Sequence, residues 1–118
     1  MPSERPSRRL EDIVEDAQAI LRYTFEMDLA AFERDSKTYD AVERCLERIS
    51  EAAAKLGDSA ATLAPGQPWH DIRGLGNRWR HGYDEIRADR LWDIVQHDLP
   101  ALSAACEDAL RRLREEQK

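Results

Sequence analysis

The sequence predicts an all-α protein, an antiparallel bundle of about five helices. Apolar residues recur at helical spacing in three long stretches, which begin at Leu10, Tyr39 and Leu91. Charged residues make up 36% of the chain and hydrophobic residues 42%, with few prolines and glycines and no β-branched runs. This balance is typical of amphipathic helices. The short connections between the stretches favour antiparallel neighbours.

The first two predicted helices lie before residue 35. Residues 1–6 are polar and contain prolines, so we expect a disordered tail there. The first helix carries a core stripe with helical spacing, made of Leu10, Ile13, Val14, Ala17, Ile20 and Leu21. A short second helix contains Leu29 and Phe32, and Asp28 is its predicted cap because a carboxylate accepts from free N–H groups at a helix start.

The third helix is long and the next begins near Pro68. The apolar stripe of the third helix consists of Tyr39, Val42, Leu46, Ile49, Ala53 and Leu56. It should end near Gly57, since glycine commonly follows the last helical residue. Pro68 fits the first turn of the fourth helix, where a missing N–H has no effect.

The last predicted helix covers residues 91–113 and follows a turn over residues 84–89. Pro100 lies inside it, and proline in a helix interior removes a hydrogen bond and collides with the preceding turn. We therefore expect Pro100 to kink or split the helix, with Asp98 as the cap of the second piece.

The whole chain, residues 1–118, is expected to form one domain with a modest core. No apolar run approaches the length of a membrane span and no secretory signal opens the chain, so we expect no membrane partner and a cytoplasmic location. Cys45 and Cys106 have no partners at zinc-site spacing, which favours buried free thiols. We expect neither a metal nor a cofactor.

The segment RGLGNRWRHGY holds the candidate chemistry, because it sets titratable and cationic groups together without an acid. On a helix, Arg73, Asn77 and His81 follow at i, i+4 and i+8 and share one face. Arg78 and Arg80 add two further cations. An imidazole among guanidinium groups suits a phosphodiester: the cations hold the phosphate and its developing charge, and the imidazole moves the proton.

A solvated helix face often carries arginines, so the same segment also fits an ordinary surface. Two observations favour the catalytic interpretation. The arginines cluster in a chain whose net charge is -6. Gly74 and Gly76 interrupt the helical pattern, and a glycine inside a helix costs about 1 kcal/mol relative to alanine, so it usually has a packing or functional reason.

Three segments of the sequence resemble the HepT-like branch of the HEPN superfamily. PWHDIRGLGN at 68–77 is followed by HGY at 81–83, and LWDIVQHDLPAL occupies 91–102. AVERCLERISEAA at 41–53 resembles the second core helix of that family. The order of the segments matches as well, and the resemblance extends from about residue 10 to 110.

The resemblance implies a small helical homodimer that acts as an RNase toxin of a type VII toxin–antitoxin system. It also implies a partner, a minimal nucleotidyltransferase antitoxin. The family motif is an arginine and a histidine separated by four to six residues of any type, followed by one residue of any type and a tyrosine. By position, His81 is the implied catalytic histidine of a metal-independent endoribonuclease. Tyr83 is the implied site where the antitoxin attaches AMP (AMPylation).

This chain departs from the family pattern at the arginine. The family arginine usually precedes the asparagine directly, where this chain has Gly76. Arg73 lies just outside the family spacing, whereas Arg78 and Arg80 are too close to His81 to fit it. Arg73 or Arg80 could supply the missing guanidinium. Two other interpretations stay open: a catalytically weak or inactive dimer that serves as AMP acceptor, and a plain helical scaffold.

The charge distribution limits the kind of nucleic acid that could bind. A protein that holds a duplex normally has a broad basic face, and this acidic chain offers only the narrow strip of Arg73, Arg78 and Arg80. Such a strip suits a short single-stranded RNA segment.

Aromatic residues outside this strip are expected to pack in the core rather than stack on bases. They are Trp69, Trp79, Trp92, Tyr23 and Tyr39.

Overall fold

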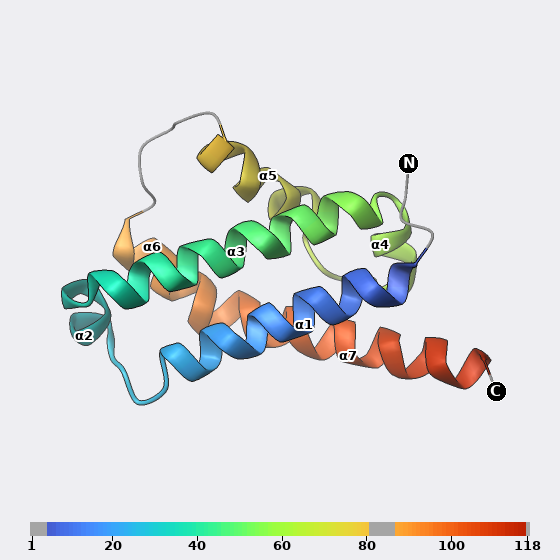
Figure 1. Ribbon diagram of the computed structural model, residues 1–118, viewed down its shortest axis with the longest axis horizontal. Helices are drawn as coiled ribbons and strands as arrows, with labels where there is room; N and C mark the ends of the chain where they lie inside the picture. Colours follow the sequence, from blue (N-terminus) through green and yellow to red (C-terminus); the bar gives the residue numbers. More distant parts are fainter. Residues whose placement is uncertain (1–4, 81–86, 118) are drawn as a thin grey trace.

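The computed structural model describes residues 5–80 and 87–117, and over these ranges it is helical and contains no β-strand (Figure 1). The predicted all-α fold is confirmed. Its elements are α1 (Pro6–Tyr23), α2 (Leu29–Arg34), α3 (Ser36–Leu56), α4 (Ser59–Leu63), α5 (Trp69–Arg80), α6 (Ala88–Asp93), the π-helical turn η1 (Ile94–Asp98) and α7 (Leu99–Glu116). The last predicted helix corresponds to α6, η1 and α7 in succession, and α4 is a further short helix. Residue Pro6, which the sequence placed in the tail, is the first residue of α1.

The core lies where α1 packs against both α3 and α7 (Figure 1). Each of these helices turns most of its apolar stripe inward, and the side chains without solvent exposure include Leu10, Ile13, Ile20, Val42, Leu56 and Cys106. Leu21 of α1 is 37% exposed, so its predicted place in the core stripe was wrong. Both cysteines are buried free thiols, as predicted. Burial raises the pKa of Cys106 to about 12, because the thiolate would lose its hydration.

Two helix starts are fixed by aspartate caps. The Asp28 carboxylate accepts a hydrogen bond of 2.8 Å from the Ala31 N–H, so the predicted cap of α2 is confirmed. Asp35 accepts from the Thr38 N–H at 3.0 Å and caps α3, and this bond holds the pKa of Asp35 below its usual value. At the other end of α3, Gly57 has a φ of 59°, a left-handed conformation that glycine adopts without strain.

The predicted split at Pro100 does not occur, because α6, η1 and α7 follow one another without a gap in the helical backbone. The Leu99 N–H bonds to the Ile94 carbonyl in a π turn, so the backbone stays helical through Asp98, whose φ is -82° and ψ -39°. Asp98 makes no capping hydrogen bond, so its predicted role was wrong. A proline ring collides with the carbonyl four residues earlier, and the wider π turn relieves this collision.

Trp69, Trp92 and Tyr39 pack in or against the core as expected, whereas the Trp79 side chain lies outside the described residues. Trp69 is 4% exposed and its indole N–H donates to the Ala64 carbonyl at 2.9 Å. The Phe32 ring is fully buried, with its centroid 5.3 Å from Trp92 and 6.0 Å from Tyr39. Tyr23 is 46% exposed, so its predicted burial was wrong. It is the last residue of α1 and lies off the core stripe.

Candidate functional site

Helix α5 carries the first part of the basic segment and lies along α3, its main packing partner (Figure 1). Arg73 is in the middle of α5 and is half-buried. The last turn of α5 contains Asn77, Arg78 and Arg80. The structure describes their backbone as helical but not their side chains. His81 and Tyr83 lie outside the described residues. The predicted grouping of Arg73, Asn77 and His81 therefore stays a prediction.

A serine of α3 ties the backbone of α5 at its centre. The Ser50 hydroxyl donates to the Arg73 carbonyl at 3.0 Å and accepts from the Gly76 N–H at 2.9 Å. Ser50 is 1% exposed, so both bonds are shielded from water. One buried hydroxyl thereby bridges two backbone groups that lie three residues, or about one helical turn, apart on the basic helix. Sequence reasoning missed Ser50, although a polar residue next to Ile49 in an apolar stripe was the available signal.

Gly76 lies on the buried side of α5. Trp69, Ile72 and Gly76 are buried and follow at i, i+3 and i+7, which is one helix face. Gly76 therefore belongs to the side of α5 that is covered, with its N–H bonded to Ser50. The position where the family pattern implies an arginine therefore belongs to the packed face of α5.

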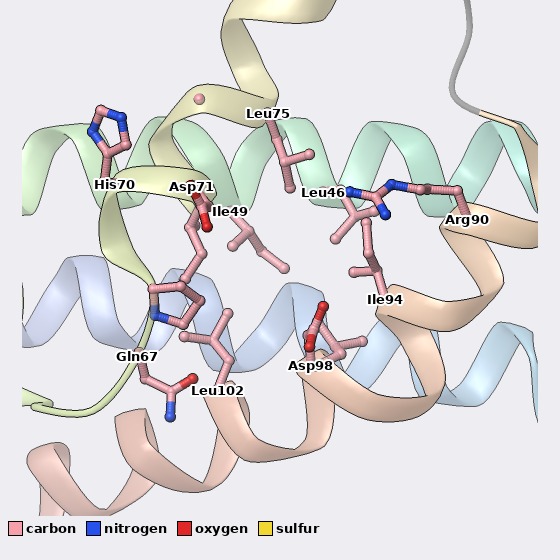
Figure 2. A pocket seen from close by; sticks show the side chains of 14 residues that line it. Leu46, Ile49, Gln67, His70, Asp71, Leu75, Arg90, Ile94, Asp98 and Leu102 are labelled. Atoms are coloured by element: carbon pink, nitrogen blue, oxygen red, sulfur yellow. The ribbon is translucent and has the colours of Figure 1, made fainter.

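A groove of about 470 Å³ opens between α5 and the surface formed by α3, η1 and α7 (Figure 2). Its apolar lining includes Leu46, Ile49, Leu75, Ile94 and Leu102. The polar lining is formed by Gln67, His70, Asp71, Arg90 and Asp98. Gly74 also lines the groove, so α5 contributes to it from its first turn to its middle. Sequence reasoning did not predict this groove, because it forms only when α3, α5, α6, η1 and α7 pack together.

The charges around this groove have no partners in the described part of the chain. Arg90 makes no ion pair there, whereas its neighbour Arg87 pairs with Asp89 at 3.0 Å. Asp71, Asp98 and His70 are also without ion pairs within residues 5–80 and 87–117. Arg90, Asp71 and Asp98 point toward the middle of the groove from different sides, and His70 lies at its outer edge (Figure 2).

Among the described residues, no cluster of three or more histidine, cysteine or acidic side chains has the arrangement of a metal site. None of the helices in residues 5–80 and 87–117 is long and apolar enough to cross a membrane.

The described residues form a small all-α domain, and the family match assigns it to the HEPN type. The family model described as ribonuclease HepT-like matches residues 13–109, and the chain belongs to this HepT-like family. It is similar to "Putative RNase MJ0127" of Methanocaldococcus jannaschii, with 34% identity over 100 residues, which cover 85% of this chain and 83% of the relative. It is equally similar to "Probable ribonuclease HepT" of Thermococcus cleftensis, with 34% identity over 98 residues, which cover 83% and 89% of the two chains. No solved structure matches the chain.

Family membership and the names of these relatives support a ribonuclease of the HEPN type. RNA is accordingly the substrate class that the family suggests.

Proposed function

We propose that this protein is the RNase toxin of a HepT-type toxin–antitoxin pair, an endoribonuclease that works without a metal. The observation that carries the proposal is the family match over residues 13–109, which includes the basic helix α5. The three arginines of the strip and the neighbouring histidine supply the groups that cleavage of a phosphodiester requires.

The proposed reaction is transfer of the phosphodiester to the adjacent ribose hydroxyl. Neutral His81 takes the proton of the 2′-hydroxyl, and the oxygen attacks the neighbouring phosphorus. The bond to the 5′-oxygen breaks, this oxygen leaves with a proton taken from water, and a 2′,3′-cyclic phosphate remains. Arg73 or Arg80 stabilises the charge on the phosphoryl oxygens, and Asn77 orients the imidazole or the phosphate.

The packing of α5 supports this chemistry through its rigidity. Trp69 anchors the first turn to the Ala64 carbonyl, and Ser50 holds the middle of the helix at two backbone groups. Catalytic groups act best when their supporting backbone is fixed, since small displacements reduce the rate strongly. In a twofold dimer, two such helices would also bring two basic strips together, which offsets the acidity of the single chain.

The purified protein is expected to cut single-stranded RNA in the presence of EDTA and to leave a cyclic phosphate end. DNA of the same sequence should stay intact, because it lacks the 2′-hydroxyl that attacks. Gel analysis and mass spectrometry of the fragments measure both results. Cleavage of the DNA, or loss of RNA cleavage on adding EDTA, would contradict the proposed mechanism.

The proposed partner is a minimal nucleotidyltransferase that adds AMP to Tyr83. An AMP group on Tyr83 places a phosphate close in sequence to His81 and the arginines, where guanidinium pairing can hold it. It would occupy the position of the RNA phosphate and repel the incoming strand. Modification thereby silences the toxin.

Tyr83→Phe should keep the cleavage activity of the parent protein and resist silencing by the transferase and ATP. The phenol is not used in the cleavage reaction, so only the modification is lost. Intact-mass measurement and an RNase assay after the transferase reaction test this. An AMP adduct that persists in Tyr83→Phe, or none on the parent, speaks against the switch.

Gly76 favours one alternative, a catalytically weak or inactive dimer that only accepts AMP and binds the transferase. The expected arginine is missing there, and the position belongs to the buried face of α5. An adduct on Tyr83 combined with no RNA cleavage by the unmodified protein would identify this alternative.

A further inference from the structure

Gly74 has no packing reason within the described chain. A Cβ atom added at this position meets nothing within 4 Å, so alanine would fit without strain. Alanine is also the better residue in the middle of a helix, because it restricts the unfolded chain and shields the backbone. A glycine that is unfavourable for the helix and not required by its neighbours indicates close approach of something else to the backbone. Gly74 lines the groove beside α5, so that approach would occur inside the groove.

The groove offers both an apolar surface and unpartnered charges of opposite sign. Leu46, Ile49 and Leu75 form an apolar surface on the α3 and α5 side (Figure 2). Arg90 reaches into the groove from α6, while Asp71 and Asp98 approach from α5 and η1 (Figure 2). This combination suits a ligand that has a flat apolar face, hydrogen-bond donors at one edge and an anionic group. An unpaired nucleotide has all three.

We propose that the groove binds one unpaired nucleotide of the RNA substrate, next to the bond that is cut. The base lies against Leu75 and the apolar surface, its exocyclic amino group donates to Asp71 or Asp98, and a phosphate pairs with Arg90. Adenine, cytosine and guanine carry such an amino group and uracil does not, so the groove disfavours uracil. The inference rests on the proposed function for its choice of RNA.

The size and the place of the groove favour a nucleotide over a protein surface. Its volume of about 470 Å³ is in the range of small-ligand sites, about 300–1,000 Å³. Gly74 precedes the end of α5 at Arg80 by six residues, which is about 9 Å of helix. A strand that lies along α5 can therefore contact the groove and the basic strip with neighbouring nucleotides.

Binding of a 2′-O-methyl oligoribonucleotide, which cannot be cleaved by the proposed route, tests the groove without catalysis. Fluorescence anisotropy should show affinity about tenfold lower for Gly74→Ala and for Arg90→Ala. Gly74→Ala should melt no lower than the parent protein, because its helix is not weakened. Arg87→Ala is the matched control, since it removes a neighbouring arginine that is already paired with Asp89 and does not line the groove. The parent protein should bind an oligonucleotide whose bases carry an amino group more tightly than oligouridine. The double variant Asp71→Asn with Asp98→Asn should bind the two equally well.

The outcomes separate the groove from the proposed reaction. Unchanged affinity in both Gly74→Ala and Arg90→Ala, or no binding by the parent protein, overturns the groove proposal. Loss of a dimer in Gly74→Ala, measured by light scattering, overturns it in favour of a second copy as the occupant. If Gly74→Ala and Arg90→Ala cleave RNA at the parent rate, the proposed function stands and the groove has no part in it. Binding with the expected dependence but no cleavage supports the groove and removes the catalytic function.

Discussion

Replacing His81 with alanine is expected to reduce RNA cleavage by about 10²–10⁴-fold, the usual contribution of a general base. The 2′-hydroxyl is a poor nucleophile until its proton is taken, and water at neutral pH takes it inefficiently. The cleavage rate of the variant should fall while its melting temperature stays close to that of the parent. His97→Ala is the matched control, because His97 is exposed, pairs with Asp93 at 3.4 Å and does not line the groove. Equal losses in the two variants would contradict a catalytic role for His81.

The arginine that supports this histidine can be found by the same assay. If Arg73 acts as the cation, Arg73→Ala should abolish cleavage and Arg78→Ala should leave most of it. If Arg80 acts, the large effect moves to Arg80→Ala. A dedicated donor to the transition state typically contributes about 10²–10³-fold. Equal and mild losses in all three variants would indicate diffuse attraction of the RNA, with no dedicated donor.

The fold was predictable because each long helix carries a complete apolar stripe. Residues such as Leu10, Ile13 and Ile20 repeat at helical spacing, and all three are fully buried. Short-range signals were equally reliable where one side chain satisfies one backbone group, as the Asp28 cap does in α2. Burial and capping depend mainly on neighbours in sequence, so one sequence carries the information.

Contacts between helices were the part that the sequence did not reveal. Pro100 indicates a disturbed helix, but the choice between a kink, a split and a π turn depends on how η1 packs on the bundle. The groove beside α5 draws residues from α3, α5, α6, η1 and α7, and no spacing in the chain connects them. Gly74 and Gly76 were both singled out as costly for a helix, yet one proved buried and the other lines a groove.

Ser50→Ala is expected to lower the free energy of unfolding by about 1–3 kcal/mol, because each of two hydrogen bonds contributes about 0.5–1.5 kcal/mol. The lost bonds join the Ser50 hydroxyl to the Arg73 carbonyl and the Gly76 N–H. Urea unfolding measures the change in stability. Ser103→Ala is the control, since Ser103 is also a buried serine of a long helix, at 7% exposure, and its hydroxyl forms no hydrogen bond with the described residues.

The same substitution should also loosen α5 and slow the proposed cleavage under conditions where the variant is fully folded. Without the bridge, no hydrogen bond within the described residues holds the middle of α5 to α3, so the arginines and the histidine beyond it are less well positioned. Hydrogen exchange of the Gly76 amide should become faster in Ser50→Ala, whereas amides of α1 keep their protection. Ser50→Thr retains the hydroxyl and should restore much of that protection. Gly76 exchange that is the same in the parent and in Ser50→Ala would show that Ser50 only fills space between α3 and α5.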